Sequence, residues 1–175
     1  RAGDELSMGG LNWRALAVPG HDMEALAFYN PERRILISGD ALWENGFGVI
    51  FSELLGEADG IAVTRATLEM LSRLAIDVVI PGHGSPFAGV DAAFARAFRR
   101  VDSFAADIDK LAWHAIKVLV SFAMLERRRL PAEDFPAFVL ALPFAISINH
   151  RYLNLPEDRL VERIERELLL VDALR

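Results

Sequence analysis

Three apolar segments of this chain each end in a glycine followed by a residue of a type that binds metal ions. The segments are VPGH, which ends in His21, ISGD, which ends in Asp40, and IPGHG, which contains His83. Short apolar runs bounded by turn residues are typical of buried strands. A carboxylate at the end of a buried strand costs free energy unless a cation or several hydrogen-bond donors compensate it. The pattern therefore predicts one polar site where three strand ends converge.

The residue types of this predicted site suit a metal ion. Two imidazoles and a carboxylate form a hard-to-borderline ligand set, and a preceding glycine lets the backbone turn sharply at a sheet edge. The chain has no cysteine, so thiolate ligands and disulfides are excluded, which fits a reducing cytoplasm. Taken singly, a histidine in a Pro-Gly turn or a Gly-Asp pair is more often structural. Their shared position at strand ends favours a metal site.

The hydrophobic pattern divides the chain near residue 90. Residues 1–90 alternate short apolar runs with turns, with a hairpin expected over 25–38 and a helix over 61–75. Residues 91–175 have helical periods, and we expect an all-α region with short helices between its prolines. The expected apolar stripes are Phe94, Phe98, Val101, Ala105 and Ile108; then Leu111, Ala115, Val118, Phe122 and Leu125; and finally Leu160, Ile164, Leu168 and Val171. The fold class expected is α/β followed by an all-α region.

Composition argues against two classes of partner, nucleic acid and membrane. The net charge of −6 arises entirely within residues 1–90, and residues 91–175 carry thirteen basic and thirteen acidic side chains, so neither part is a basic nucleic-acid surface. The longest apolar run, 138–148, is shorter than the roughly 18 residues of a membrane span and contains Pro143. With 53% hydrophobic residues, the chain can bury a real core.

The order PGH, SGD nineteen residues later, then VIPGHG resembles the third, fourth and fifth metal motifs of the metallo-β-lactamase fold hydrolases. GDELSMGGLNWRALAVPGH resembles the strand that leads into the third motif, so the resemblance covers residues 3 to about 87. It implies two metal ions, usually zinc. His21 would bind the first ion, His83 the second, and Asp40 would bridge both as the catalytic carboxylate. The implied reaction is hydrolysis of a small-molecule substrate by a metal-bridging hydroxide. An ester or thioester, a lactone or lactam, and a phosphodiester all stay open as substrates.

The chain departs from that family in one respect. The H-x-H-x-D-H motif that supplies most of both coordination shells is absent, and so is the N-terminal half of the αββα sandwich. We therefore expect residues 1–90 to be the C-terminal half of such a sandwich in a truncated fragment, with residues 91–175 as a helical extension. Alone, this fragment should be inactive. It should self-associate or retain an N-terminal fragment, since half a sandwich exposes an apolar sheet face.

Other residues and functions are weaker candidates. Trp43 and Asn45, on the glycine-rich loop after Asp40, would line a substrate pocket, or else form a surface turn with one packed tryptophan. Asp22 would support His21 or cap a turn. Two alternative functions stay open: a nucleic-acid-processing or regulatory module with a winged-helix-like C-terminus, and a non-catalytic relative that has lost its metals.

Overall fold

The chain folds into two compact units, Arg1–Ala106 and Asp107–Arg175. The structure is a computed structural model, and it describes residues 1–57, 59–127 and 129–170. The division falls after residue 106, whereas the sequence pattern places it at residue 90. The first unit therefore also includes the helix of residues 90–106, which packs beside the helix of residues 60–72.

The first unit contains a five-stranded mixed sheet. Its strands, in spatial as in chain order, are β1 (Glu5–Met8), β2 (Leu11–Ala17), β3 (Leu26–Asn30), β4 (Ile35–Gly39) and β5 (Val78–Pro81). The β1 to β4 neighbours pair antiparallel, and β4 and β5 pair parallel. Because β2 and β4 both run opposite to β3, they point the same way as β5. The carboxyl ends of β2, β4 and β5 therefore lie at one edge of the sheet.

The hairpin expected over residues 25–38 is present as β3 and β4. The hairpin of β1 and β2 was not expected. Its turn is Gly9-Gly10, and both glycines have positive φ, of 62° and 74°. Two successive positive φ values are what a tight hairpin turn requires, so the Gly-Gly pair was a usable signal in the sequence.

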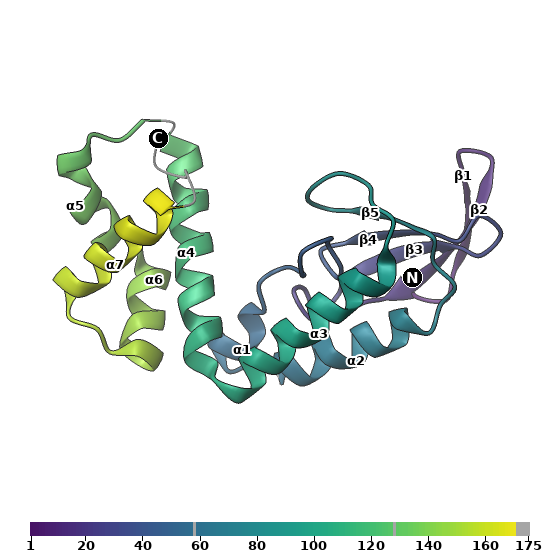
Figure 1. The fold of residues 1–175 in the computed structure, drawn as a ribbon, viewed down its shortest axis with the longest axis horizontal. Helices are drawn as coiled ribbons and strands as arrows, with labels where there is room; N and C mark the ends of the chain where they lie inside the picture. The colour runs from purple at the N-terminus through teal and green to yellow at the C-terminus, as the bar shows by residue number, and fades with distance from the viewer. Residues whose placement is uncertain (58, 128, 171–175) are drawn as a thin grey trace. The chain divides into compact units, whose positions relative to one another are not determined.

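Helices cover one face of the sheet. They are α2 (Gly60–Ser72) and α3 (Val90–Ala106), and the short helix α1 (Phe51–Leu55) contacts α2. Figure 1 shows α2 and α3 side by side along the sheet, and an ion pair between Arg65 and Asp102 joins them. Leu68 and Leu71 of α2 are fully buried, as are Leu36 and Val79 of the sheet. The core of this unit therefore lies between the sheet and its helices.

The apolar stripe of α3 differs slightly from expectation. Phe94 and Val101 are buried as expected, but Ala105 is exposed and Phe104 is buried in its place. Phe104 packs edge-on against Phe47, with ring centroids 6.3 Å apart. This contact with the loop after β4, which sequence periodicity cannot show, turns the buried face toward residue 104.

The other face of the sheet is apolar and partly exposed. Strand pairing places Leu26, Phe28, Ile37 and Ile80 on this face, since Phe28 is opposite Ile37 and Ile37 is opposite Ile80. Phe28 and Ile37 are half-buried, and Leu26 and Ile80 are each 37% exposed. We call these four residues the open sheet face.

The second unit is helical, as expected. Its elements are α4 (Ile108–Arg127), η1 (Ala132–Asp134), α5 (Phe135–Leu140), α6 (Pro143–Ile148), the π-type turn η2 (Asn149–Leu153) and α7 (Glu157–Leu170). Pro136 and Pro143 lie in the first turns of α5 and α6, where a missing N–H costs nothing. Within residues 107–127 and 129–170 there is no strand, so the alternative of a winged helix lacks its β-wing there.

The buried stripes of the second unit match expectation in α7 and only in part in α4. Leu160, Ile164 and Leu168 are buried, and Val171 lies outside the described residues. In α4 the buried positions follow Ala112, Ile116 and Val120, whereas Phe122 is 57% and Leu125 is 72% exposed. The expected α4 stripe is therefore wrong at its C-terminal end. Leu111 and Ala115 of that stripe are buried as expected, and toward the C-terminal end of α4 burial depends on where the other helices of the unit pack.

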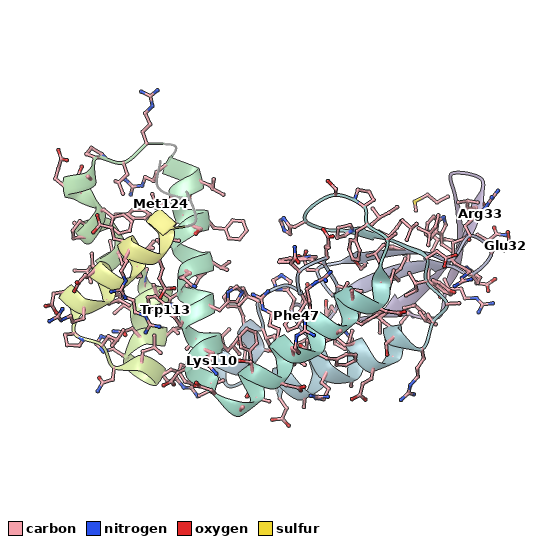
Figure 2. All side chains as sticks on the ribbon, in the orientation of Figure 1. Glu32, Arg33, Phe47, Lys110, Trp113 and Met124 are labelled. Carbon is pink, nitrogen blue, oxygen red and sulfur yellow. The ribbon has the colours of Figure 1, made fainter. Side chains whose placement is uncertain are left out.

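A polar cluster joins α4 to α7. Trp113 points from α4 toward α7 (Figure 2), and its Nε1–H donates to Glu167 Oε2 at 2.8 Å. Lys117 Nζ donates to the same oxygen at 2.8 Å, and Arg163 Nε donates to Oε1 at 3.3 Å. The Arg163 guanidinium also lies over the Trp113 ring, 3.8 Å from its centroid. We call these four residues the Glu167 cluster.

No single helix among the described residues is long and apolar enough to cross a membrane. Ala132–Leu140 and Pro143–Leu153, which are bent by 63° from each other, match such a span only when taken together.

Candidate metal centre

His21, Asp40 and His83 lie together at the edge where β2, β4 and β5 end. His21 follows β2 by four residues, Asp40 follows β4 directly, and His83 lies two residues beyond β5. His21 Nε2 is 3.6 Å from Asp40 Oδ2, and His83 Nε2 is 3.8 Å from Asp40 Oδ1. Each oxygen of one carboxylate thus faces a different histidine. The topology brings the three together because their strands point in the same direction.

A backbone hydrogen bond orients the His21 ring. Its Nδ1 lies 2.6 Å from the carbonyl oxygen of Val49. A carbonyl can only accept, so Nδ1 is the donor of this bond, and Nε2 is left facing Asp40. A proton or a metal ion between Nε2 and the carboxylate would each suit this arrangement. Metal-binding histidines are oriented in this way by their second ring nitrogen.

Two glycines leave space for these side chains. A Cβ at Gly48 would lie 2.6 Å from His21 Cγ and 3.0 Å from Asp40 Cβ. A Cβ at Gly82 would lie 2.5 Å from Asp40 Oδ1. The glycine before His83 is therefore required by close approach. The glycines before His21 and Asp40 have positive φ, 151° at Gly20 and 53° at Gly39, which fits the expected sharp turns.

Trp43 contacts two of the three predicted ligands. Its Nε1–H donates to Asp40 Oδ1 at 3.1 Å, and its ring lies edge-on to the His83 ring, with centroids 5.1 Å apart. In this structure Trp43 thus touches the candidate centre itself, and its place in a substrate pocket stays a prediction. Asn45 is exposed on the same loop.

The distances fit two half-sites that share Asp40. Zinc binds histidine nitrogen and carboxylate oxygen at about 2.1 Å, so two tetrahedral ligand atoms lie about 3.4 Å apart. The 3.6 Å and 3.8 Å separations are slightly wider. Among the described residues, no group of three or more His, Asp or Glu is arranged to hold one metal ion. Each half-site therefore supplies two protein ligands where a stable zinc site has three or four.

Several supporting residues were not found from the sequence. The Val49 carbonyl accepts the hydrogen bond from His21, and Gly48 leaves space for His21 and Asp40. Arg96 and Arg100 of α3 bind carbonyls of the loop after Asp40. Of these, only Gly48, in the segment GFGVI, could have been recognised in the sequence, because every residue has a backbone carbonyl. Asp22 Oδ1 accepts the Glu24 N–H at 2.8 Å, which is the turn-capping alternative.

Residues 1–83, the segment that carries all three candidate ligands, match the sequence model of the Metallo-beta-lactamase superfamily. This segment belongs to the metallo-β-lactamase superfamily. The resemblance in the sequence motifs is thereby confirmed. A solved metallo-β-lactamase-fold structure, a beta-lactamase domain protein from Burkholderia ambifaria, aligns with a TM-score of 0.56 at 24% identity. The alignment covers 86% of this chain and 44% of that one, and it shows the fold alone.

The curated relatives that match this chain are hydrolases by name. Hydroxyacylglutathione hydrolase of Idiomarina loihiensis is 43% identical over 49 residues, which are 28% of this chain and 19% of that protein. Acyl-coenzyme A thioesterase MBLAC2 of Homo sapiens is 25% identical over 124 residues, which are 70% of this chain and 43% of that protein. The chain thus spans less than half of the length of these metallo-β-lactamase-superfamily relatives.

Proposed function

We propose that this chain carries part of the active site of a zinc-dependent hydrolase that acts on a thioester. The observation that supports this most is Asp40, which has one histidine opposite each oxygen. A carboxylate in this position can be shared by two cations. The fixed orientation of the His21 ring supports the same proposal, because it directs Nε2 toward the shared carboxylate.

The names of the relatives favour a thioester over the other substrates. One is a hydrolase of an acylated glutathione, and the other is a thioesterase of acyl-coenzyme A. Both names describe an acyl group carried on a larger molecule. Lactone and phosphodiester substrates are the alternatives that an experiment has to separate.

Each residue has a defined part in the proposed reaction. Two bound cations would lower the pKa of water and stabilise the negative charge that develops on the attacked oxygen. His21 and His83 would each hold one cation, and Asp40 would hold both at a fixed separation. The Trp43 N–H occupies one lone pair of Asp40 Oδ1 and so limits the rotation of the carboxylate.

Each half-site has two protein ligands among the described residues, so a stable zinc site would need further ligands. We propose that an N-terminal segment carrying histidines supplies them, and that it packs on the open sheet face. This would complete both coordination shells and bury the exposed Leu26 and Ile80.

The test compares substrates on the full-length protein that contains this chain. Metal content is measured by elemental analysis, and turnover is measured with a thioester, a lactone and a phosphodiester. We expect about two zinc ions and the highest kcat/KM on the thioester. Preference for the phosphodiester would contradict the substrate class. A folded protein without metal and without turnover would instead support the non-catalytic alternative.

A further inference from the structure

We propose that Arg100 of α3 is a positioning residue for the candidate centre, acting through the loop that carries Trp43. This inference rests on the proposed function, because it concerns the carboxylate that would hold the metal ions. We call residues 43–47 the tryptophan loop.

The tryptophan loop is held from α3. Within the loop, the Trp43 N–H donates to the Gly46 carbonyl at 2.7 Å. From the helix, Arg96 Nε donates to the Glu44 carbonyl at 2.7 Å and Arg100 Nη1 donates to the Asn45 carbonyl at 3.3 Å. Two arginines one helical turn apart therefore bind successive carbonyls of one exposed loop.

Arg100 is also packed between aromatic rings. Its guanidinium carbon lies 5.6 Å from the centroids of both Phe47 and Phe104. Figure 2 shows Phe47 beside α3, and Phe47 is 2% exposed. A Cβ at Gly46 would run into Arg100 Nη1, so the loop passes close to the guanidinium at a residue without a side chain. Burial lowers the pKa of Arg100 from its ordinary value, which shows that the cation is partly removed from water.

The loop in turn directs the Trp43 indole at one oxygen of Asp40. That oxygen, Oδ1, is the one that faces His83. Oδ2, which faces His21, has no contact with Trp43 among the interactions that the structure gives. If Arg100 releases the loop, Oδ1 loses its N–H donor while Oδ2 keeps its surroundings. Loss of Arg100 should thus weaken the His83 half-site more than the His21 half-site.

The test uses the complete 175-residue chain and needs no turnover. The indole N–H signals of Trp13, Trp43 and Trp113 are recorded by ¹H–¹⁵N NMR, and Trp43→Phe assigns the Trp43 signal. In Arg100→Gln we expect the Trp43 signal to move and its hydrogen exchange to accelerate about tenfold or more. The Trp13 and Trp113 signals should stay in place, since their acceptors are Met8 and Glu167. Arg99→Gln, an exposed neighbour of equal charge, is the control.

Zinc titration then separates this inference from the proposed function. In Arg100→Gln we expect the shift of the His83 ring signals on zinc addition to be reduced, with the His21 signals less affected. An unmoved Trp43 signal in a folded Arg100→Gln chain would overturn the positioning role. If Arg100→Gln does not fold, Arg100→Lys, which keeps the charge, is measured in its place. An unmoved Trp43 signal in that variant would equally overturn the positioning role. A moved Trp43 signal supports the positioning role even if no zinc binds to this chain, and the proposed function is then decided separately, by the zinc content and turnover of the full-length protein.

Discussion

Asp40 is the residue on which both half-sites depend, because each of its oxygens faces a different histidine. In the full-length protein, Asp40→Ala should lower bound zinc and reduce kcat/KM by about 10⁴-fold, as loss of a central catalytic group does. Elemental analysis and steady-state kinetics measure the two effects. Asp22→Asn, on the exposed turn beside His21, should change neither. Full activity in Asp40→Ala would remove this carboxylate from the site.

Gly48 is the residue that makes room for His21 and Asp40. Gly48→Ala would place a methyl group 2.6 Å from His21 Cγ, so the imidazole must move from its hydrogen bond with Val49. We expect a loss of about 1–3 kcal/mol in the free energy of unfolding, together with weaker zinc binding. Urea denaturation and zinc titration measure these. Glu44→Ala, an exposed residue of the same loop, is the control. Unchanged stability and unchanged zinc binding would show that the site relaxes around the methyl group.

At the residue scale, the sequence predicted that His21, Asp40 and His83 lie together, because each follows a glycine at a strand end. It could not predict Arg100 as a partner of the loop, since arginine on an exposed helix is ordinary. The role of Trp43 also depends on tertiary structure. Its contact with Asp40 arises only when the loop folds back, as the hydrogen bond from the Gly48 N–H to the Asp40 carbonyl shows.

At the element scale, the Glu167 cluster joins α4 to α7. Burial raises the pKa of Glu167, but hydrogen bonds from Lys117 and Trp113, with the charge of Lys117 and a bond from Arg163, outweigh it. The pKa therefore lies below its ordinary value. Glu167→Gln should lower the free energy of unfolding by about 1–2 kcal/mol at pH 7, since the side chain is 27% exposed and the bonds are charge-assisted. Urea denaturation measures this, with the exposed Glu165→Gln as the control.

The same cluster predicts a pH dependence. A carboxyl with a lowered folded-state pKa stabilises the protein fully above its unfolded value of about 4.3, and this contribution is lost as the pH falls further. The stability difference between the parent chain and Glu167→Gln should therefore be constant near neutral pH and shrink below about pH 4. A difference that grows on acidification would contradict this sign.

Elements with strong local signals were predicted well, and their boundaries were not. Helix α2 and the β3–β4 hairpin follow directly from apolar spacing and turn residues. The α4 stripe failed at Phe122 and Leu125, because burial there depends on where α5, α6 and α7 pack. The extent of the first unit was missed for a similar reason. Periodicity shows that residues 90–106 form a helix, but the ion pair of Asp102 with Arg65 depends on the fold.

At the scale of the whole molecule, two protein ligands for each ion make a weak site. Complete four-ligand zinc sites contribute about 10–16 kcal/mol at neutral pH. We therefore expect the 175-residue chain to bind zinc with a Kd weaker than about 1 μM, which corresponds to about 8 kcal/mol, and to show no hydrolysis. Isothermal titration and assays with thioester, lactone and phosphodiester substrates check this. Two tightly bound zinc ions with turnover, in a monomer of verified mass, would show that the motifs have been aligned wrongly.

The open sheet face predicts how the chain behaves alone. Contiguous apolar surface of this kind drives association, so we expect concentration-dependent self-association in sedimentation velocity. Charge introduced by Leu26→Lys with Ile80→Lys should shift the distribution toward monomer. Leu125→Lys removes the most exposed of the large apolar side chains noted in the second unit and should have no such effect. If Leu125→Lys alone shifted the distribution toward monomer, the associating surface would instead lie on α4.

The parallel pairing of β4 with β5 also sets an order in which the centre can assemble during folding. His21 and Asp40 are 19 residues apart and are joined through antiparallel neighbours with short turns. Asp40 and His83 are 43 residues apart, and α1 and α2 lie between them in the chain. Closing the longer loop costs more entropy and is slower. A nascent chain would thus present the His21 half of its centre first, and an early-bound ion could act as a nucleus onto which the last strand closes.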